Sequence, residues 1–450
     1  MEPSKAPIAP PPFLTSLLIG ISLALYLYVG YFLVRSDFVP LFMSYTVLFF
    51  LHVYLCEKQW TEGMVMGLTL AGLGFRAAML GSIPNLSDDF YRFIWDGNCG
   101  LRGICVYGWR PSALAAHFPA DAALGIPALN QLNSPEYYSV YPPVLQGFFV
   151  LAVWAGKGIM GELIALKLII WLLECGTIAG LWLLLRQRGI HYKNVLLYAL
   201  NPLCILELCG NIHFEAAMIF FMVWAFYFIN RNQLILSAFF MGLAISTKLW
   251  PLIFIIFLPR RIGWKRSILY GMMSGGVFMA SFIPLKADMS SLLHIYESMG
   301  LYFKTFEFNA GIWYLVREAG YYIYGWNILY KAYPWLMGAA VASIGAIMMI
   351  ERAPNIYNWW RPCMAGLFSY FIFSPIVHPW YITPLCALSI FTGQRAVLYW
   401  SWLCWLSYWA YGNGSALESM GLIFIEYTLV LALGGYALYR SIIIRPNSGR

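Results

Sequence analysis

The chain has 450 residues, of which 61% are hydrophobic and only 11% are charged. A soluble domain carries about 25% charged residues because its surface faces water, so lipid must cover part of this protein, and a soluble globular protein is excluded. The net charge of +8 comes from basic residues scattered between apolar segments, which is typical of cytoplasmic loops and excludes a nucleic-acid-binding surface.

Apolar segments recur along the whole chain and predict an all-α polytopic membrane protein with about 12–14 transmembrane helices. Several segments are shorter than the ~20 residues that a straight span needs. Breaks such as Trp250-Pro251 predict broken helices around a cavity. The first segment is too long for a signal-peptide core and predicts a retained anchor. The segments lie at 13–35, 40–56, 64–82, 162–185, 193–209, 212–230, 233–247, 250–259, 267–285, 334–350, 361–376, 380–392, 396–411 and 421–440.

Spans and loops divide the chain into four parts. We expect an N-terminal helical hairpin over 1–63, a transmembrane module over 64–285, a second extracytoplasmic loop over 286–333 and a C-terminal transmembrane module over 334–450. Lys and Arg collect in cytoplasmic loops, and their positions predict that the loops 83–161 and 286–333 face the other side. The turns at 211–213 and 378–379 fall on that same outer side.

One apolar run, 144–155, does not fit this topology. A full span there would place Arg186 and Arg188 outside, so we expect the run to lie in the interface or to dip into the membrane and return. The alternative is an ordinary span with the rest of the topology inverted. An accessibility label at Arg188 would decide between them.

The polar stretch 85–143 is too long for a simple connector and too aromatic for disorder. It opens with Asp88, Asp89, Arg92 and Asp96. On a helix Asp89 and Arg92 are i,i+3 neighbours, whereas Asp88 and Asp89 point about 100° apart, so only one of the two acids is expected to face a cleft. The alternative is that both acids are interfacial caps, with Ser87 as the N-cap.

Lone polar side chains from later segments converge on the same predicted face. Tyr141 lies where the polar stretch closes, His213 and Glu215 flank the start of an apolar segment, Lys248 lies within one, and His378 lies in an outer turn. Ionisable groups at membrane depth are costly and usually face a cavity or a partner. Singly, His213 is equally explained as a packed histidine, and Lys248 as a snorkelling or paired lysine. Their coincidence at one interface favours a functional site.

Two features of the composition concern metals and disulfides. The nine cysteines show no CxxC pair, and Cys99 and Cys105 share one loop, which allows a disulfide between them. Asp88 and Asp89 could hold a divalent ion. A lipid-linked sugar substrate with a single phosphate group, however, does not need a metal ion to neutralise its charge. We therefore expect no metal and no other cofactor.

Carboxylates beside cations at a lipid–water boundary suit a substrate with a phosphate head and a lipid tail. Lys and Arg can neutralise a leaving phosphate, a carboxylate can deprotonate an incoming hydroxyl, and aromatic rings can stack on sugars. The pattern favours glycosyl transfer from a lipid-phosphate donor. The alternatives are a transporter or flippase, for which internal repeats and midplane charges would be expected, and a structural subunit without catalysis.

Several motifs occur in order along the chain. They are SDDFYRFIWDG at 87–97, PEYYSVYPPVLQ at 135–146, GNIHFEA at 210–216, K-x-x-P at 248–251 and HPWY at 378–381. Together they resemble the GT-C superfamily of polyprenyl-phosphate-sugar-dependent membrane glycosyltransferases, and more narrowly its bacterial mannosyltransferase-like branch. Two departures, Cys105-Val106-Tyr107 in place of Asn-Pro-Tyr and Glu215 in place of Asp, bear on acceptor or sugar identity more than on reaction class.

The resemblance implies a GT-C-like bundle with its catalytic module at 64–285 and a juxtamembrane helix after Tyr141-Pro142-Pro143. The implied reaction is inverting transfer of a hexose, mannose above all, from a polyprenyl-phosphate donor to a lipid, glycan or protein acceptor. The implied location is the bacterial inner membrane, with the site facing the periplasm or exterior. Asp88 or Asp89, with a preference for Asp89, would be the general base. The substrate-binding set would be Arg92, Asp96, Tyr141, His213, Glu215, Lys248, His378 and Tyr381.

Overall fold

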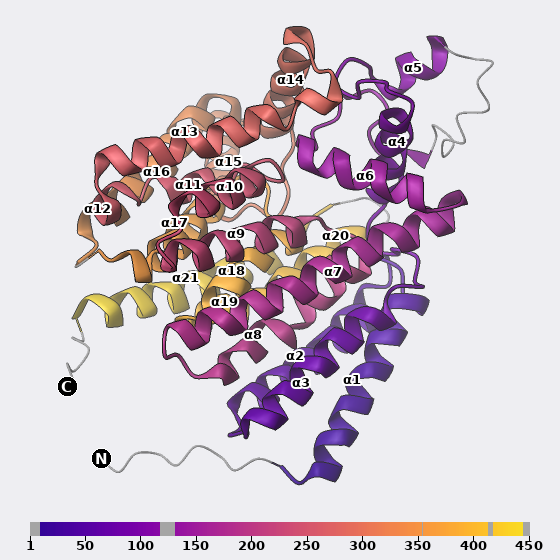
Figure 1. Cartoon of the computed structure of the whole chain (residues 1–450). Helices are drawn as coiled ribbons and strands as arrows, with labels where there is room; N and C mark the ends of the chain where they lie inside the picture. Colours follow the sequence, from indigo (N-terminus) through magenta and orange to yellow (C-terminus); the bar gives the residue numbers. More distant parts are fainter. Residues whose placement is uncertain (1–9, 118–130, 353, 413–416, 444–450) are drawn as a thin grey trace.

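The computed structural model describes residues 10–117, 131–352, 354–412 and 417–443, and it places them in an all-helical fold (Figure 1). Within these residues the only extended pairing is an isolated parallel bridge between Phe308 and Ile376. The predicted all-α polytopic class is confirmed. Residues 118–130 of the predicted loop 83–161 lie outside the described residues.

The first half of the chain forms a bundle beside a cluster of short helices. In Figure 1 the elements α4 to α6 lie together at one end of the long helix α7. The elements are α1 (Pro12–Phe32), α2 (Phe38–Glu57), α3 (Glu62–Ala78), α4 (Phe90–Leu101), α5 (Pro111–His117), α6 (Pro143–Ala155), α7 (Gly158–Gln187), η3 (Tyr192–Val195), α8 (Leu196–Ala199), the π-helix η4 (Cys204–Gly210), α9 (Glu215–Asn230) and α10 (Leu234–Ile245).

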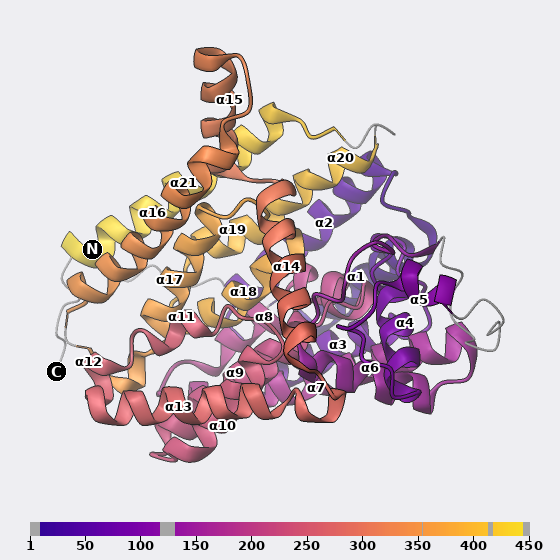
Figure 2. The same cartoon turned by 90° about the horizontal axis from the view of Figure 1, so that it is seen from above.

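The second half packs a further group of helices against the first. In Figure 2 the helix α15 extends away from the body of the molecule, while α18 and α19 lie towards its centre. The elements are α11 (Leu252–Ile255), α12 (Pro259–Ile262), α13 (Trp264–Ala280), η5 (Ile283–Leu285), α14 (Met289–Thr305), α15 (Gly311–Tyr324), α16 (Leu329–Ile350), η6 (Ile356–Asn358), α17 (Trp360–Ile372), η7 (Pro379–Ile382), α18 (Thr383–Ser389), α19 (Arg395–Leu403), η8 (Cys404–Tyr408), α20 (Trp409–Gly412) and α21 (Met420–Ile443).

Among the described residues, five helices are long and apolar enough to cross a membrane: α1, α2, α7, α16 and the segment Trp264–Leu285 that contains α13. A sixth candidate is the pair η4 and α9, which is bent by 114°. The expected 12–14 spans are therefore not reached by helices of full length. The remaining apolar segments form shorter or broken helices, such as α6 and α10, as the proline breaks in the sequence indicated.

The packing of the long helices explains why the chain carries so few charged residues on its surface. In α16 and in Trp264–Leu285 only 17% of the membrane-length window is buried inside the protein, so most of this apolar surface faces outwards, where lipid can cover it. One pair of buried charges joins α3 to α7. Arg76 on α3 and Glu174 on α7 are fully buried and form an ion pair of 2.9 Å between Nε and Oε2. Tyr198 donates a further hydrogen bond of 2.7 Å to Glu174.

A close approach of α4 to α6 builds the frame of the polar loop. A Cβ atom at Gly97 would lie 2.5 Å from the backbone oxygen of Phe149, so the two helices can meet here only because residue 97 is glycine. Helix α6 has 13 residues and begins at Pro143. Proline suits this position because it lacks the backbone N–H, which at the first position of a helix has no partner within the helix. It is about 20 Å long and too short for the ~30 Å hydrocarbon core. This length agrees with a juxtamembrane helix, whose position relative to the membrane stays a prediction.

The cysteines of the polar loop are free. Cys99 is buried and Cys105 is half-buried, and neither forms a disulfide. The pairing that their shared loop allowed is therefore not present. Cys99 instead packs with Trp95 and Tyr107 in a small apolar cluster beneath the loop.

Candidate active site

The two adjacent acids at the start of α4 have different surroundings. Asp88 forms an ion pair with Arg35, from the turn between α1 and α2, with 3.2 Å between Oδ2 and Nη2. The side chains of both residues are about 40% exposed. Arg35 also lies over the ring of Tyr411, 5.1 Å from its centroid. The carboxylate of Asp88 is therefore already neutralised by a neighbouring cation.

Asp89 occupies the N-cap position of α4, but its side chain does not cap the helix. It accepts a hydrogen bond of 2.7 Å from Nδ2 of Asn133. Burial raises the pKa of Asp89 above its usual range; the charges of His213 and Lys248 and the bond from Asn133 oppose this rise, and Asp88 adds to it. The side chain of Asp89 therefore does not act as a cap, whereas Ser87 Oγ accepts a hydrogen bond of 3.3 Å from the amide of Asp89, as the capping alternative expected of Ser87.

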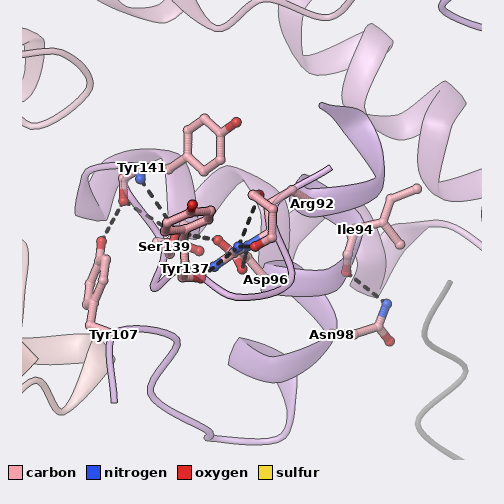
Figure 3. Close-up of polar contacts among 10 residues, drawn as sticks. Arg92, Ile94, Asp96, Asn98, Tyr107, Tyr137, Ser139 and Tyr141 are labelled. Carbon is pink, nitrogen blue, oxygen red and sulfur yellow. Dashed lines mark hydrogen bonds and ion pairs between the residues drawn. The ribbon is translucent and has the colours of Figure 1, made fainter. Parts of the chain in front are cut away.

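Arg92 and Asp96 fasten the polar loop to α4 (Figure 3). They form a buried i,i+4 ion pair of 2.8 Å between Nε and Oδ1. Arg92 also donates to the backbone oxygens of Ser134 and Tyr137, at 3.0 and 3.1 Å. The other oxygen of Asp96 accepts bonds of 2.5 Å from Ser139 and 3.0 Å from Gln146. These two side chains are thus engaged in holding the loop, a different position from the substrate contact that the resemblance implied.

Tyr141 forms part of an aromatic wall between α4, α6 and the start of α9. Its ring packs edge-on against Phe93 and Phe149, with centroids 4.9 and 5.7 Å apart. Phe214 contacts both phenylalanines, at 5.6 and 5.3 Å. This wall places His213 beside the N-terminus of α4 although the two are more than 120 residues apart.

The imidazoles of two histidines, His213 and His378, both stack on the indole of Trp380. The ring centroid of His213 lies 3.7 Å from that of Trp380, and the centroid of His378 lies 4.3 Å from it, with interplanar angles of 13° and 6°. Both imidazoles are almost fully buried. Nε2 of His213 and Nδ1 of His378 have no hydrogen-bond partner within the described structure. A buried polar atom without a partner is costly, so both nitrogens are candidates for binding a ligand.

Lys248 lies in a cage of one carboxylate and two aromatic rings. Its Nζ is 2.7 Å from Oε1 of Glu215, and it lies 4.9 Å from the ring centroid of Trp250 and 4.8 Å from that of Tyr381. Glu215 is buried, whereas the side chain of Lys248 remains 24% exposed. The cage fixes the position of the ammonium group and leaves part of it accessible.

The structure brings most of the predicted site residues together. His213 and Lys248 lie within electrostatic range of Asp89, and both also lie within range of His378. A backbone bond of 3.1 Å from Val144 to Ser246 ties the end of the polar loop to the segment before Lys248. Asp88 lies at the edge of this group, and Arg92 and Asp96 lie in the loop network beside it.

Sequence reasoning did not identify several residues of the site. Arg35 is 53 residues from Asp88, and nothing local indicates the pairing. Asn133 is one polar residue among many in the loop. Glu207 was overlooked inside the apolar segment 193–209, although a lone acid at membrane depth is the same kind of signal that singled out Lys248. No three His, Cys, Asp or Glu side chains of the described residues form a cluster that could hold a metal ion.

The fold and the site define a class of protein. It is a polytopic membrane protein in which a carboxylate, an ammonium group and two imidazoles lie near one another, close to the N-terminus of the short helix α4. The family model described as alpha-(1->6)-mannopyranosyltransferase, N-terminal domain, matches residues 27–262, just over half of the chain, and the chain belongs to this family. It is therefore a glycosyltransferase of a mannosyltransferase family, and the resemblance seen in its motifs is confirmed. No curated relative matches the chain.

The family assignment bears on the alternatives. It supports the enzyme over the transporter or flippase and over a structural subunit. The matched range holds Arg35, Asp89, His213 and Lys248, whereas His378 and its neighbours lie beyond it. The site thus combines side chains from both halves of the chain.

Proposed function

We propose that the protein transfers mannose from a polyprenyl-phosphate donor to a hydroxyl group of a lipid, glycan or protein acceptor, with inversion at the anomeric carbon. The observation that carries the proposal is the position of Asp89, a carboxylate of raised pKa within electrostatic range of His213 and Lys248. A base facing cationic groups is the arrangement that an incoming hydroxyl and a departing phosphate require.

Asp89 is the base in this proposal. Among the residues described, none forms an ion pair with Asp89, so its oxygens can still accept a proton, whereas Asp88 is paired with Arg35. A raised pKa makes a carboxylate a stronger base at neutral pH. Asn133 holds one oxygen of Asp89 by a bond of 2.7 Å, which orients the other oxygen for the proton of the acceptor.

Lys248, His378 and His213 receive the donor phosphate. Lys248 has three N–H donors, and its contact with Glu215 leaves donors available. As the acceptor oxygen bonds to the anomeric carbon, the bond from that carbon to the phosphate oxygen breaks and the acceptor proton passes to Asp89. The negative charge that develops on the phosphate is stabilised by the ammonium of Lys248 and by imidazole N–H groups. This step requires no cofactor.

A lipid-linked donor suits the position of the site. The site lies at the ends of apolar helices, where a phosphate head can reach Lys248 while its prenyl chain remains among lipid tails. Trp250, Trp380 and Tyr381 supply aromatic surface beside the cation, which suits a hexose ring. In this proposal the site faces the extracytoplasmic side of the bacterial inner membrane, as the distribution of Lys and Arg predicts.

The proposal is tested with the purified protein in lipid nanodiscs. Polyprenyl-phosphate-[14C]mannose and GDP-[14C]mannose are offered separately, with octyl α-mannoside as the acceptor, and the product linkage is determined by NMR. We expect label from the lipid donor only, with the anomeric configuration opposite to that of the donor. Transfer from the nucleotide donor alone, or retention of configuration, would contradict the proposal. Hydrolysis of the lipid donor without acceptor serves as a second readout of donor use.

A further inference from the structure

Glu207 is a fully buried carboxylate that lies directly behind His213. It belongs to the π-helix η4, a rare element that is frequent at functional sites. Asn211 donates to its Oε2 at 3.1 Å, and Tyr408 from η8 donates to its Oε1 at 2.9 Å. Nδ1 of His213 lies 3.3 Å from Oε2. The carboxylate is thus held from two elements and faces the imidazole.

The surroundings of Nδ1 determine the tautomer of His213. Besides the carboxylate of Glu207, the backbone oxygen of the same residue lies 2.9 Å from Nδ1. Both groups accept hydrogen bonds, so Nδ1 carries the proton. Nε2, which has no partner within the described structure, is therefore an acceptor in the neutral ring and a donor only in the imidazolium form.

The backbone between the two residues is held in an unusual conformation. Ile212 has a φ of +60°, which is costly for a β-branched residue. The amide of His213 bonds to the oxygen of Glu207 at 3.2 Å, and the amide of Asn211 bonds to the oxygen of Leu206 at 2.9 Å. A π-helix followed by a left-handed isoleucine fits a segment shaped to bring His213 back over Glu207.

The edge of the imidazole that carries Nε2 is buried, and charged groups lie near it. Trp380 covers one face of the ring at 3.7 Å. Two ionisable groups lie within electrostatic range of His213: Asp89 at the start of α4 and His378 in the turn before η7. Lys248, which is paired with Glu215, lies within range of both. Glu207 is thus the carboxylate that contacts the side of the ring opposite Nε2.

We propose that Glu207 is a positioning residue whose carboxylate, facing Nδ1–H of His213, stabilises the imidazolium, so that Nε2–H donates a hydrogen bond to an anionic oxygen of the substrate. The inference rests on the proposed function in one respect, the identity of that oxygen as part of the donor phosphate. No proton is transferred on binding, because the imidazolium keeps both protons. The bond exists only while the ring is an imidazolium, because the neutral ring with its proton on Nδ1 has no N–H at Nε2.

The test compares the full-length protein with Glu207→Gln and His213→Gln. The isosteric Gln keeps the shape of the π-helix and removes the charge. Binding of polyprenyl-phosphate-mannose is measured from pH 5 to 9, and the tautomer of His213 is read by NMR of 15N-labelled histidine, with His213→Gln identifying the signal. The control is Glu174→Gln, which removes another fully buried carboxylate that contacts Arg76 and not His213.

We expect the Nδ1–H tautomer at high pH in both the unmodified protein and Glu207→Gln, because the backbone oxygen remains. In Glu207→Gln the alkaline loss of donor binding moves to lower pH by about one pH unit or more. His213→Gln weakens binding about 10- to 100-fold, and adding Glu207→Gln to it causes no further loss. In Glu174→Gln the alkaline limb stays where it is.

Two results would overturn the inference: an Nε2–H tautomer in the unmodified protein, or an unchanged alkaline limb in Glu207→Gln together with a loss that adds to that of His213→Gln. Failure of the proposed function is distinguishable, because it would show as an unmodified protein that does not bind the lipid donor at all. In that case the 15N signals of His213, compared between the unmodified protein and Glu207→Gln, would still show whether Glu207 stabilises the imidazolium.

Discussion

Arg35 pairs with Asp88, whereas the adjacent Asp89 forms no ion pair with any residue that the structure describes. Asn133 bridges the two acids, with 2.7 Å from its Nδ2 to Asp89 and 3.5 Å to Asp88. Neighbouring carboxylates with different partners take different roles when their surroundings move their proton affinities apart. On this difference rests the proposal that Asp89 is the base and that Asp88 has a supporting position.

Arg35→Gln tests how much the pair with Asp88 contributes to stability. Both side chains are partly exposed, so water screens their attraction, and we expect the free energy of unfolding to fall by no more than about 1 kcal/mol. Thermal unfolding in detergent measures this. A loss of several kcal/mol would show that the pair is a structural anchor of the α1–α2 turn.

Asn133→Ala tests the surroundings of Asp89 through pH. The bond from Asn133 stabilises the ionised carboxylate and so lowers its pKa; removing the bond raises the pKa further. Because the base must be ionised, the acid limb of the rate profile should move to higher pH. Ser112→Ala is the control, since Ser112 bonds to Glu136 in the same loop and does not contact Asp89. An acid limb that moves to lower pH would contradict the assignment.

Arg92→Gln separates a structural role from a role in donor binding. Breaking a buried ion pair leaves a charge without its partner, and we expect a loss of about 3 kcal/mol of stability with little change in donor affinity of the folded fraction. The double variant R92Q/D96N should recover part of this loss. If Arg92→Gln remains stable and binds the lipid donor tenfold more weakly, Arg92 contacts the phosphate after all.

Lys248→Gln and Glu215→Gln test the two sides of the cage. Lys248→Gln removes the cation that receives the phosphate and leaves Glu215 buried without its partner. We expect at least a tenfold loss of donor affinity, since a charge-assisted bond is worth about 1.5–3 kcal/mol. Glu215→Gln keeps the cation and should bind the donor at least as well as the unmodified protein. Equal losses in both variants would mean that only the pair as a structural unit matters.

The amino-acid pattern predicted the class of fold and most members of the site. Apolar segments identified the helices, and the acids, the lysine and the histidines at segment ends were found because charge is rare at membrane depth. Which segments form full-length spans was not predicted, because an apolar run does not distinguish a straight helix from a bent pair such as η4 and α9. The match to a mannosyltransferase family agrees with the motifs.

The remaining features depend on contacts between distant segments. Arg92 and Asp96 stand in the same motif as Asp89, yet backbone oxygens from Ser134 and Tyr137 occupy the arginine, and no local pattern reveals them. The bond between Tyr408 and Glu207 joins residues 201 positions apart. The π-helix that carries Glu207 lies within the mostly apolar segment 193–209, whose pattern does not distinguish a π-helix from an α-helix.

The central claim is that Asp89, and not its neighbour, accepts the proton of the acceptor. The most direct measurement compares kcat for mannosyl transfer from polyprenyl-phosphate-mannose in Asp89→Asn and Asp88→Asn, two isosteric variants, after both are shown to bind the donor. We predict a fall in kcat of about 10²- to 10⁴-fold for Asp89→Asn and less than about tenfold for Asp88→Asn. The reverse order, or full activity in Asp89→Asn, would contradict the account.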